Sequence, residues 1–245
     1  MKEVRARRPL ADSTAVHDQV YDAIRQALIT GKIAPGVGVS LRSLAAELGV
    51  SPMPVRDAVR RLVAERALAI NPANDDTRHD YVKLLISLGE LESAESALAP
   101  ALAQIPRQLR FEALLHWLQA LQFATTDERA QWTLDQFDAA LAANKRDFDT
   151  RLAKSRLLMA AGQWEAAMEE LLEIIMRDKK WDAEAPRKTF VAILEILTPP
   201  APKAAADGSG KSAGGIELTG KSALQEDPQA ALVASYRRKL SMALN

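Results

Sequence analysis

Apolar residues recur at intervals of three and four along most of the chain, the spacing that places them on one face of an α-helix. Alternating apolar and polar positions are scarce, and alanine and leucine outnumber valine and isoleucine. The pattern predicts an all-α protein. The stretch 198–215 departs from it, because its Pro, Gly, Ser, Ala and Lys content is typical of a flexible linker.

Three apolar stripes precede residue 67, and they predict three short helices around one small core. The third helix is expected to begin in "SPMPVRDAVRRL", residues 51–62, with Ser51 as its N-cap. Pro52 and Pro54 then fall in the first turn, where backbone N–H groups have no acceptor within the helix, so the prolines start the helix rather than break it. The stripes consist of Val20, Ala23, Ile24, Ala27 and Leu28, of Leu41, Leu44, Ala45 and Leu48, and of Val55, Ala58, Val59, Leu62 and Val63.

The connections between these helices are short and contain glycine. Gly31, Gly36 and Gly38 follow the first helix, Ser40 can cap the second, and "LGVS" turns tightly into the third. The segment is therefore predicted to be a helix-turn-helix.

The third helix has a basic outer face. Met53, Arg56, Asp57 and Arg60 are expected opposite its apolar stripe, and arginines in such a place can bind phosphates or the O6 and N7 atoms of guanine. The helix is therefore predicted to read double-stranded DNA. The alternative is a solvated face, which is the usual role of arginines on an amphipathic helix.

The order and spacing of these residues resemble the DNA-binding domain of the GntR family of bacterial winged helix-turn-helix regulators. The resemblance covers about residues 14–68 and rests on "VYDAIRQALITGKIAPG", "LRSLAAELGVSPMPVRDAVRRL" and "AERAL". It implies that Arg42 and Arg56 stand where family members contact DNA, whereas Pro52 replaces a residue that is often arginine in the family. The predicted DNA-binding residues are Arg42, Ser51, Met53, Arg56 and Arg60.

The rest of the chain matches itself. A shift of 73 residues aligns 67–98 with 140–171 without a gap, and 13 of the 32 positions are identical. The match predicts two helical hairpins of one design, each with a capping aspartate, a glycine in the turn and a small residue on the returning helix. These residues are Asp76 and Asp149, Gly89 and Gly162, and Ala94 and Ala167.

The shift is about twice the tetratricopeptide period of roughly 34 residues, so a further hairpin is expected across 103–139, in "LRFEALLHWLQALQF" and "DERAQWTLDQFDAAL". The hairpins resemble tetratricopeptide (TPR) units. More closely, residues 67–245, with "DFDTRLAKSRLLMAAGQWEAAMEELLEIIMRDKKWDAEAPRKTF" and "SYRRKLSMALN", resemble the C-terminal helical domain of thioredoxin-like chaperedoxins. That resemblance implies a holdase that passes clients to chaperonins, here without the thioredoxin fold.

The two resemblances meet near residue 66. The GntR domain should continue into a two-stranded wing, but residues 67–71 already belong to the repeat, so we expect no wing and a third helix that runs into a repeat helix. The join fits a natural fusion and equally an artificial or mis-assembled one. The predicted parts are a basic N-terminal arm (1–13), a helix-turn-helix (14–66), a TPR-like domain (67–197), a flexible linker (198–226) and a C-terminal helix that packs on the repeats (227–245).

Charge and amino-acid composition favour some classes of function and exclude others. Residues 1–66 carry 11 Lys and Arg against 7 Asp and Glu, and the remainder carries 21 against 25, so a polyanion is expected to meet the N-terminal part. The absence of cysteine excludes disulfides, thiolate metal sites and thiol redox chemistry.

His17, His79 and His116 are solitary and no glycine-rich phosphate loop is present, so no catalytic residue, metal ligand or cofactor is predicted. Core packing between the hairpins is expected of four tryptophans, and a binding groove is the alternative; they are Trp117, Trp132, Trp164 and Trp181.

Two functions remain open. The first is a GntR-type transcriptional regulator that binds double-stranded DNA and uses helical repeats in place of an effector domain. The second is a non-redox, chaperedoxin-like interaction or holdase module whose N-terminal helices are a structural remnant. Both include a protein partner or client on the repeats and a cytoplasmic location without membrane contact, and a homodimer would allow binding to two half-sites.

Overall fold

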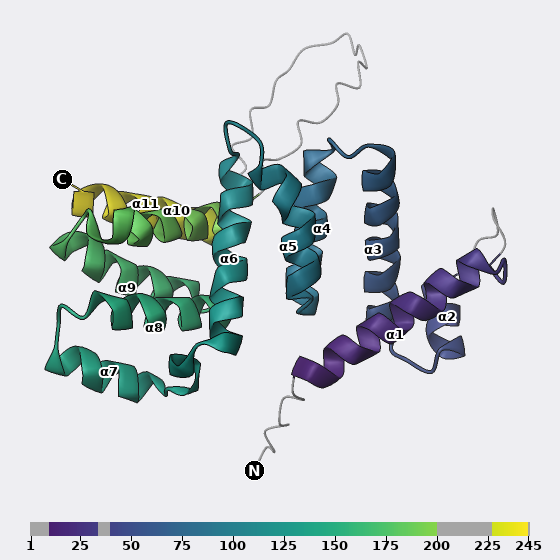
Figure 1. Cartoon of the computed structure of the whole chain (residues 1–245), viewed down its shortest axis with the longest axis horizontal. Coiled ribbons are helices and arrows are strands. Elements are labelled where there is room, and N and C mark those ends of the chain that lie inside the picture. The colour runs from purple at the N-terminus through teal and green to yellow at the C-terminus, as the bar shows by residue number, and fades with distance from the viewer. Residues whose placement is uncertain (1–9, 34–39, 200–226, 245) are drawn as a thin grey trace, which may run out of the picture. The chain divides into compact units, whose positions relative to one another are not determined.

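The computed structural model describes residues 10–33, 40–199 and 227–244 (Figure 1). All regular structure in these ranges is helical, which confirms the predicted all-α class. The chain divides into two compact units, Met1–Asp127 and Glu128–Asn245. The boundary lies inside the hairpin predicted across 103–139, so the helix-turn-helix and the first repeat helices share one compact unit.

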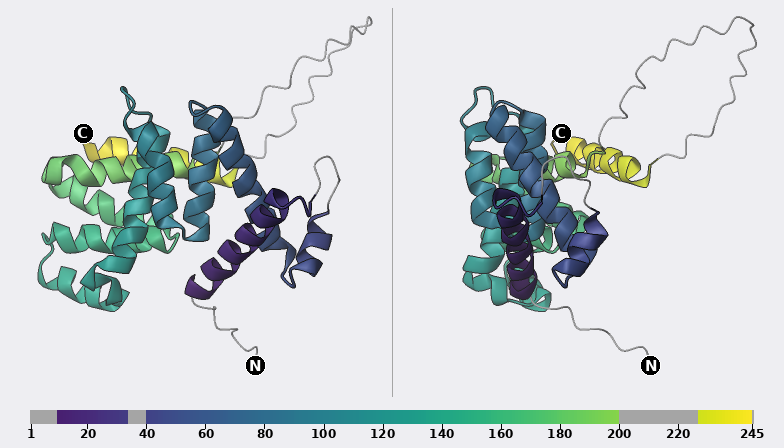
Figure 2. Two further views of the ribbon diagram at one scale, coloured as in Figure 1. Left: turned by 45° about the vertical axis from the view of Figure 1, so that its right-hand side comes forward. Right: turned by 90° about the vertical axis from the view of Figure 1, so that its right-hand side faces the viewer.

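Within its described residues, the first unit contains six helices. In Figures 1 and 2, α1 crosses the lower part of α3, and α3, α4, α5 and α6 follow one another as neighbours. The helices are α1 (Leu10–Ile29), α2 (Leu41–Glu47), α3 (Pro52–Ile70), α4 (Asp75–Leu88), α5 (Leu91–Leu102) and α6 (Leu109–Thr126).

The hairpin of α4 and α5 follows the predicted design except at its cap. Gly89 ends α4 with φ 82°, a conformation that glycine adopts without a Cβ penalty, and Ala94 is fully buried on the returning helix. The N-cap is Asn74, whose Oδ1 accepts a hydrogen bond from the Thr77 N–H at 3.1 Å. The prediction that Asp76 caps this helix was wrong, because Asp76 already lies in the first turn.

The second unit contains a second copy of this hairpin. Its helices within the described residues are η1 (Glu128–Gln131), α7 (Leu134–Ala143), α8 (Phe148–Ala160), α9 (Trp164–Arg177), η2 (Trp181–Glu184), α10 (Ala185–Leu197) and α11 (Pro228–Leu244). Asp147 caps α8 by accepting from the Thr150 N–H at 3.0 Å, so the predicted cap Asp149 was again two residues late. Gly162, with φ 73°, makes the turn, and Ala167 is fully buried on α9.

The expected helix in "DERAQWTLDQFDAAL" is interrupted. A short 3-10 turn ends at Gln131, and α7 starts three residues later behind Thr133. Thr133 and Gln136 form a reciprocal capping box, with the Gln136 N–H donating to Thr133 Oγ1 at 3.3 Å and the Thr133 N–H donating to Gln136 Oε1 at 2.8 Å. A capping box begins a new helix, which explains why the apolar pattern alone merged the two segments.

Helix α11 packs on α9 and α10 through the buried side chains Val233, Tyr236 and Leu240. At its start the Gln229 N–H donates to Asp227 Oδ1 at 2.9 Å. The Tyr236 hydroxyl donates to Glu169 Oε1 of α9 at 2.9 Å, and Lys239 binds the same oxygen at 2.5 Å. Most of the predicted linker, residues 200–226, lies outside the described residues.

The four tryptophans contact different parts of the chain. Trp117 packs against the core of α4, α5 and α6, and the Trp181 ring meets Phe148 edge-on at 5.7 Å. Trp132 is 37% exposed beside Phe137. Trp164 lines a groove of about 340 Å³ with Leu197 and Leu232. Core packing therefore describes only part of the set.

Candidate nucleic-acid interface

Three helices of the first unit share a small apolar core of their own. Side chains from α1, α2 and α3 meet there, and the stripes predicted from the sequence supply its five buried residues. The core consists of Val20, Ile24, Ala45, Val55 and Ala58, with Val16, Tyr21, Leu41, Leu44, Leu48, Val50, Val59 and Leu62 packed around it. This core sets which side of α3 faces outward.

A short turn connects α2 to α3. Gly49 has φ 67°, and the Val50 N–H donates to the Ala45 carbonyl at 3.0 Å, so the chain reverses within three residues. The preceding helix is held at its start by Ser40, whose side chain accepts from the Ser43 N–H at 3.0 Å, as the sequence predicted. Together these features give the helix-turn-helix geometry.

Helix α3 begins as its two prolines predict. Ser51 occupies the N-cap position with extended backbone, and Pro52 and Pro54 lie in the first turn. The Ser51 side chain makes no capping hydrogen bond, in contrast to Ser40. Its hydroxyl is therefore available to an external acceptor.

The five predicted DNA-binding residues are all exposed. Arg42 lies at the start of α2, Ser51 precedes α3, and the other three lie on the outer side of α3. Within the described part of the chain, no ion pair engages the three arginines among them. Free guanidinium groups at a helix-turn-helix are suited to phosphates and guanine edges.

Two other charged side chains of α3 point toward α1 rather than outward. Asp57, expected on the outer face, is half-buried, and its Oδ2 lies 3.6 Å from Nε2 of His17 on α1. Arg61, the residue after Arg60, is also half-buried, and its guanidinium lies over the Tyr21 ring, 4.0 Å from the ring centroid. Asp57 and Arg61 thus belong to the packing between helices.

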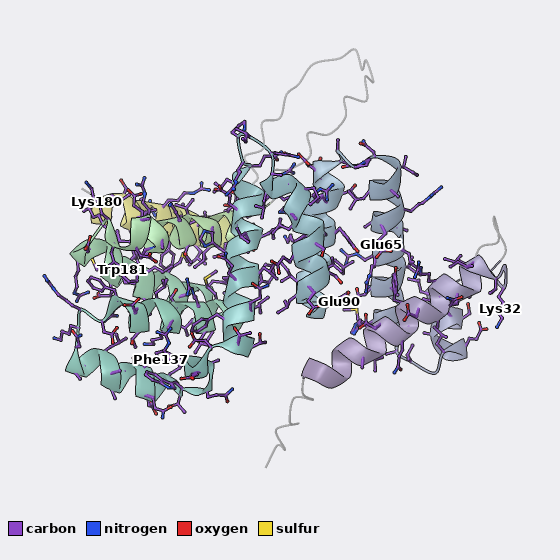
Figure 3. All side chains as sticks on the ribbon, viewed as in Figure 1. Lys32, Glu65, Glu90, Phe137, Lys180 and Trp181 are labelled. Atoms are coloured by element: carbon purple, nitrogen blue, oxygen red, sulfur yellow. The ribbon has the colours of Figure 1, made fainter. Side chains whose placement is uncertain are left out.

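Arg61 is the centre of a polar network that the sequence did not predict. Its Nε donates to Glu65 Oε1 at 3.1 Å, and its Nη1 forms ion pairs with Asp18 at 3.4 Å and with Glu90. Glu65 also accepts hydrogen bonds from the hydroxyls of Tyr21 at 2.6 Å and Tyr81 at 2.9 Å. Figure 3 shows Glu65 and Glu90 between α3 and the α4–α5 hairpin. The network therefore ties the helix-turn-helix to the first repeat.

The network shifts the titration of its members. Burial and the hydrogen bond to Glu65 raise the pKa of Tyr21 to about 12, and the same two causes raise the pKa of Tyr81. Burial lowers the pKa of Arg61, but the charge of Glu90 and the hydrogen bond to Glu65 outweigh it and leave the pKa raised. Arg61 is consequently a fixed structural charge.

Comparison with known families decides what this module is. Residues 16–74 match the model of the bacterial regulatory proteins of the gntR family. These residues form a GntR helix-turn-helix domain. A stretch of 55 residues, 22% of the chain, is 40% identical to the HTH-type transcriptional regulator McbR of Escherichia coli (strain K12). It spans 25% of that regulator, so the similarity is confined to the GntR domain.

Two tetratricopeptide repeat models match the chain, over residues 57–118 and 127–207. The first of them overlaps the GntR match across residues 57–74, most of which lie in α3. One helix is therefore shared by the GntR domain and the repeats. No solved structure matches the chain significantly.

The overlap explains why a repeat helix, rather than a two-stranded wing, follows α3. Helix α3 continues to Ile70, and the four residues 71–74 lead directly into α4. No strand occurs in the described range 40–199, so a repeat helix stands where a wing would follow the GntR domain.

Other kinds of site find no support in the described residues. They contain no cluster of three or more His, Asp or Glu side chains that could hold a metal ion. None of their helices is long and apolar enough to cross a membrane. His79 packs edge-on against Phe111 at 6.2 Å, and burial lowers its pKa, which agrees with a place at the edge of the core.

Proposed function

We propose that the protein is a GntR-type transcriptional regulator that binds double-stranded DNA with its helix-turn-helix and a protein partner with its TPR repeats. Arg42, Ser51, Met53, Arg56 and Arg60 are the DNA-contacting residues in this proposal. The main support is a GntR domain whose outer arginines have no ion-pair partner among the described residues, while the neighbouring Arg61 is fully engaged.

Without a wing, one GntR domain offers few phosphate contacts. Affinity for DNA grows with the number of phosphates neutralised, so a single chain should bind weakly and with a steep dependence on salt. A homodimer would double the contacts and would favour two half-sites about one helical turn apart. We propose that the working form on DNA is such a dimer.

Titration of the full chain onto random duplex DNA at several salt concentrations tests the proposal. We expect Arg42→Ala and Arg56→Ala each to weaken binding and to reduce the slope of log affinity against log salt by about 0.9, the effect of one lost phosphate contact on B-form DNA. Arg177→Ala is a matched control, because Arg177 lies in the second unit and pairs with Glu173 of its own helix. An intact chain that binds no duplex at low salt would refute DNA binding.

The second candidate is a non-redox, chaperedoxin-like holdase or interaction module. It is favoured by the two tetratricopeptide matches, which together span more of the chain than the GntR match does. Suppression of the aggregation of an unfolding client by the intact chain, with no binding to DNA, would support this function instead.

A further inference from the structure

The outer face of α3 presents one large apolar side chain among its arginines. Met53 is 61% exposed, and Arg56 and Arg60 follow it. At about 100° per residue, these three side chains project within about 60° of one another around the helix axis. Val55 and Ala58 are buried on the opposite side, so the direction of this face is fixed by the core.

The chemistry of this face matches one kind of surface. An exposed methionine gains free energy only when another apolar group covers it, whereas the arginines around it require an anion or an acceptor. The major groove of DNA offers both: phosphates and the acceptor edge of guanine for the arginines, and the 5-methyl group of thymine for the methionine. The flexible and polarisable thioether adapts to such a contact.

The two prolines limit the hydrogen bonds that the start of the helix can donate. Pro52 is exposed beside Met53 but has no N–H and no polar side-chain atom, so it can donate no hydrogen bond to a base, and Pro54 is buried. Their fixed φ also restricts the backbone on both sides of Met53. Met53 is consequently the large apolar side chain that this turn exposes, next to the hydroxyl of Ser51.

We infer that Met53 is a specificity-determining residue that covers the methyl group of a thymine in the bound half-site. Met53 and Arg56 are about 4.5 Å apart along the helix axis, close to the roughly 3.4 Å rise between base pairs. The thymine therefore lies within one or two base pairs of the position that Arg56 contacts. This inference rests on the proposed DNA binding and adds the identity of one base.

Replacement of thymine by deoxyuridine tests the contact, because the two bases differ only by the methyl group. A preferred duplex is first selected from a random pool with the full chain, and each thymine is then replaced in turn. We expect one replacement to weaken binding of the intact chain about threefold to fivefold, the effect of one buried methyl group.

Variants of the chain assign that effect to Met53. In Met53→Ala the sensitive replacement should have no further effect, and in Met53→Leu the sensitivity should be retained. Met242→Ala is the matched control, because Met242 is 70% exposed on α11 in the second unit. This variant should respond to deoxyuridine like the intact chain.

The outcomes separate this inference from the proposed function. If the intact chain binds the selected duplex and no replacement changes the affinity, or if Met53→Ala keeps the sensitivity, Met53 does not read a thymine while DNA binding stands. If no duplex is bound at low salt, both are wrong.

Discussion

Arg61 of α3 and Glu90, the residue that precedes α5, form an ion pair that joins the GntR domain to the first repeat hairpin. Their side chains are 13% and 8% exposed, so both charges are largely removed from water. Glu90 then depends on Arg61 for compensation, while Arg61 is compensated by Glu90, Glu65 and Asp18. The helix-turn-helix and the hairpin are consequently expected to unfold together.

Removal of one partner should therefore reduce stability strongly. We expect Arg61→Met to lower the free energy of unfolding by about 2–3 kcal/mol, because Glu90 and Glu65 lose their compensating charge. Urea denaturation followed by circular dichroism measures the change. Arg60→Met, on the exposed side of the same helix, should change the free energy by less than about 0.5 kcal/mol. Equal effects of the two substitutions would contradict a structural role for the ion pair.

The tyrosines should lose their protons at a higher pH in the folded protein than in the unfolded chain. All three tyrosines of the chain have a raised pKa, and that of Tyr21 is raised from 10.0 to about 12. The fold favours the neutral phenol, so this stabilisation is complete below pH 10 and is lost as the pH rises through about 12. Ultraviolet absorbance should show little tyrosinate at pH 10 in the native chain and about half ionisation in urea. A native midpoint near pH 10 would show that Glu65 and Glu169 do not hold the hydroxyls.

The turn between α2 and α3 should require a residue that adopts the left-handed backbone conformation. Gly49 has φ 67°, and a Cβ at this position would meet no atom within 4 Å. Gly49→Ala should therefore lower the free energy of unfolding by about 1 kcal/mol, and the whole effect should come from backbone conformation. Gly49→Asn should lose less, because asparagine tolerates this conformation better. Thermal unfolding of the two variants provides the comparison, and equal melting temperatures for both and the parent would refute the assignment.

The attachment of α11 should weaken in acid. Burial raises the pKa of Glu169, but hydrogen bonds from Lys239 and Tyr236 outweigh it and hold the pKa below its ordinary value of 4.5. A depressed carboxyl pKa stabilises the fold above the unfolded value, and the contribution is lost as the pH falls through the folded value. Glu169→Gln should therefore lower stability at neutral pH, by less than about 1 kcal/mol because the pair is solvent-exposed. The difference from the parent chain should vanish well below pH 4.5, and a constant difference across pH would contradict the ion pair.

Local signals predicted the helices and their turns. Ser40 and the prolines at residues 52 and 54 act within one turn of themselves, and Gly89 fixes a single backbone conformation, so no distant contact was needed to interpret them. The caps of α4 and α8 were placed two residues late, because several polar residues in a row can each serve as N-cap. Only the coordinates select Asn74 and Asp147.

The polar network could not be predicted in the same way. Arg61 and Glu65 are four apart, a spacing that signals an ion pair on one helix. Nothing local indicates that Tyr21, Tyr81 and Glu90, which belong to three other segments, converge on them. Arg61 therefore had no role predicted from the sequence, and only packing shows how its environment differs from that of Arg60.

Helix α3 runs without interruption from its exposed arginines into the repeats, so the number of residues between them fixes the direction of those arginines relative to the repeats. One residue inserted near Leu62 would turn Met53 and Arg56 by about 100° with respect to the α4–α5 hairpin. Seven inserted residues would restore their direction, because seven residues make nearly two full turns. Any exchange of this helix-turn-helix for that of another GntR domain must therefore preserve the helical register, whatever the similarity of the sequences on either side.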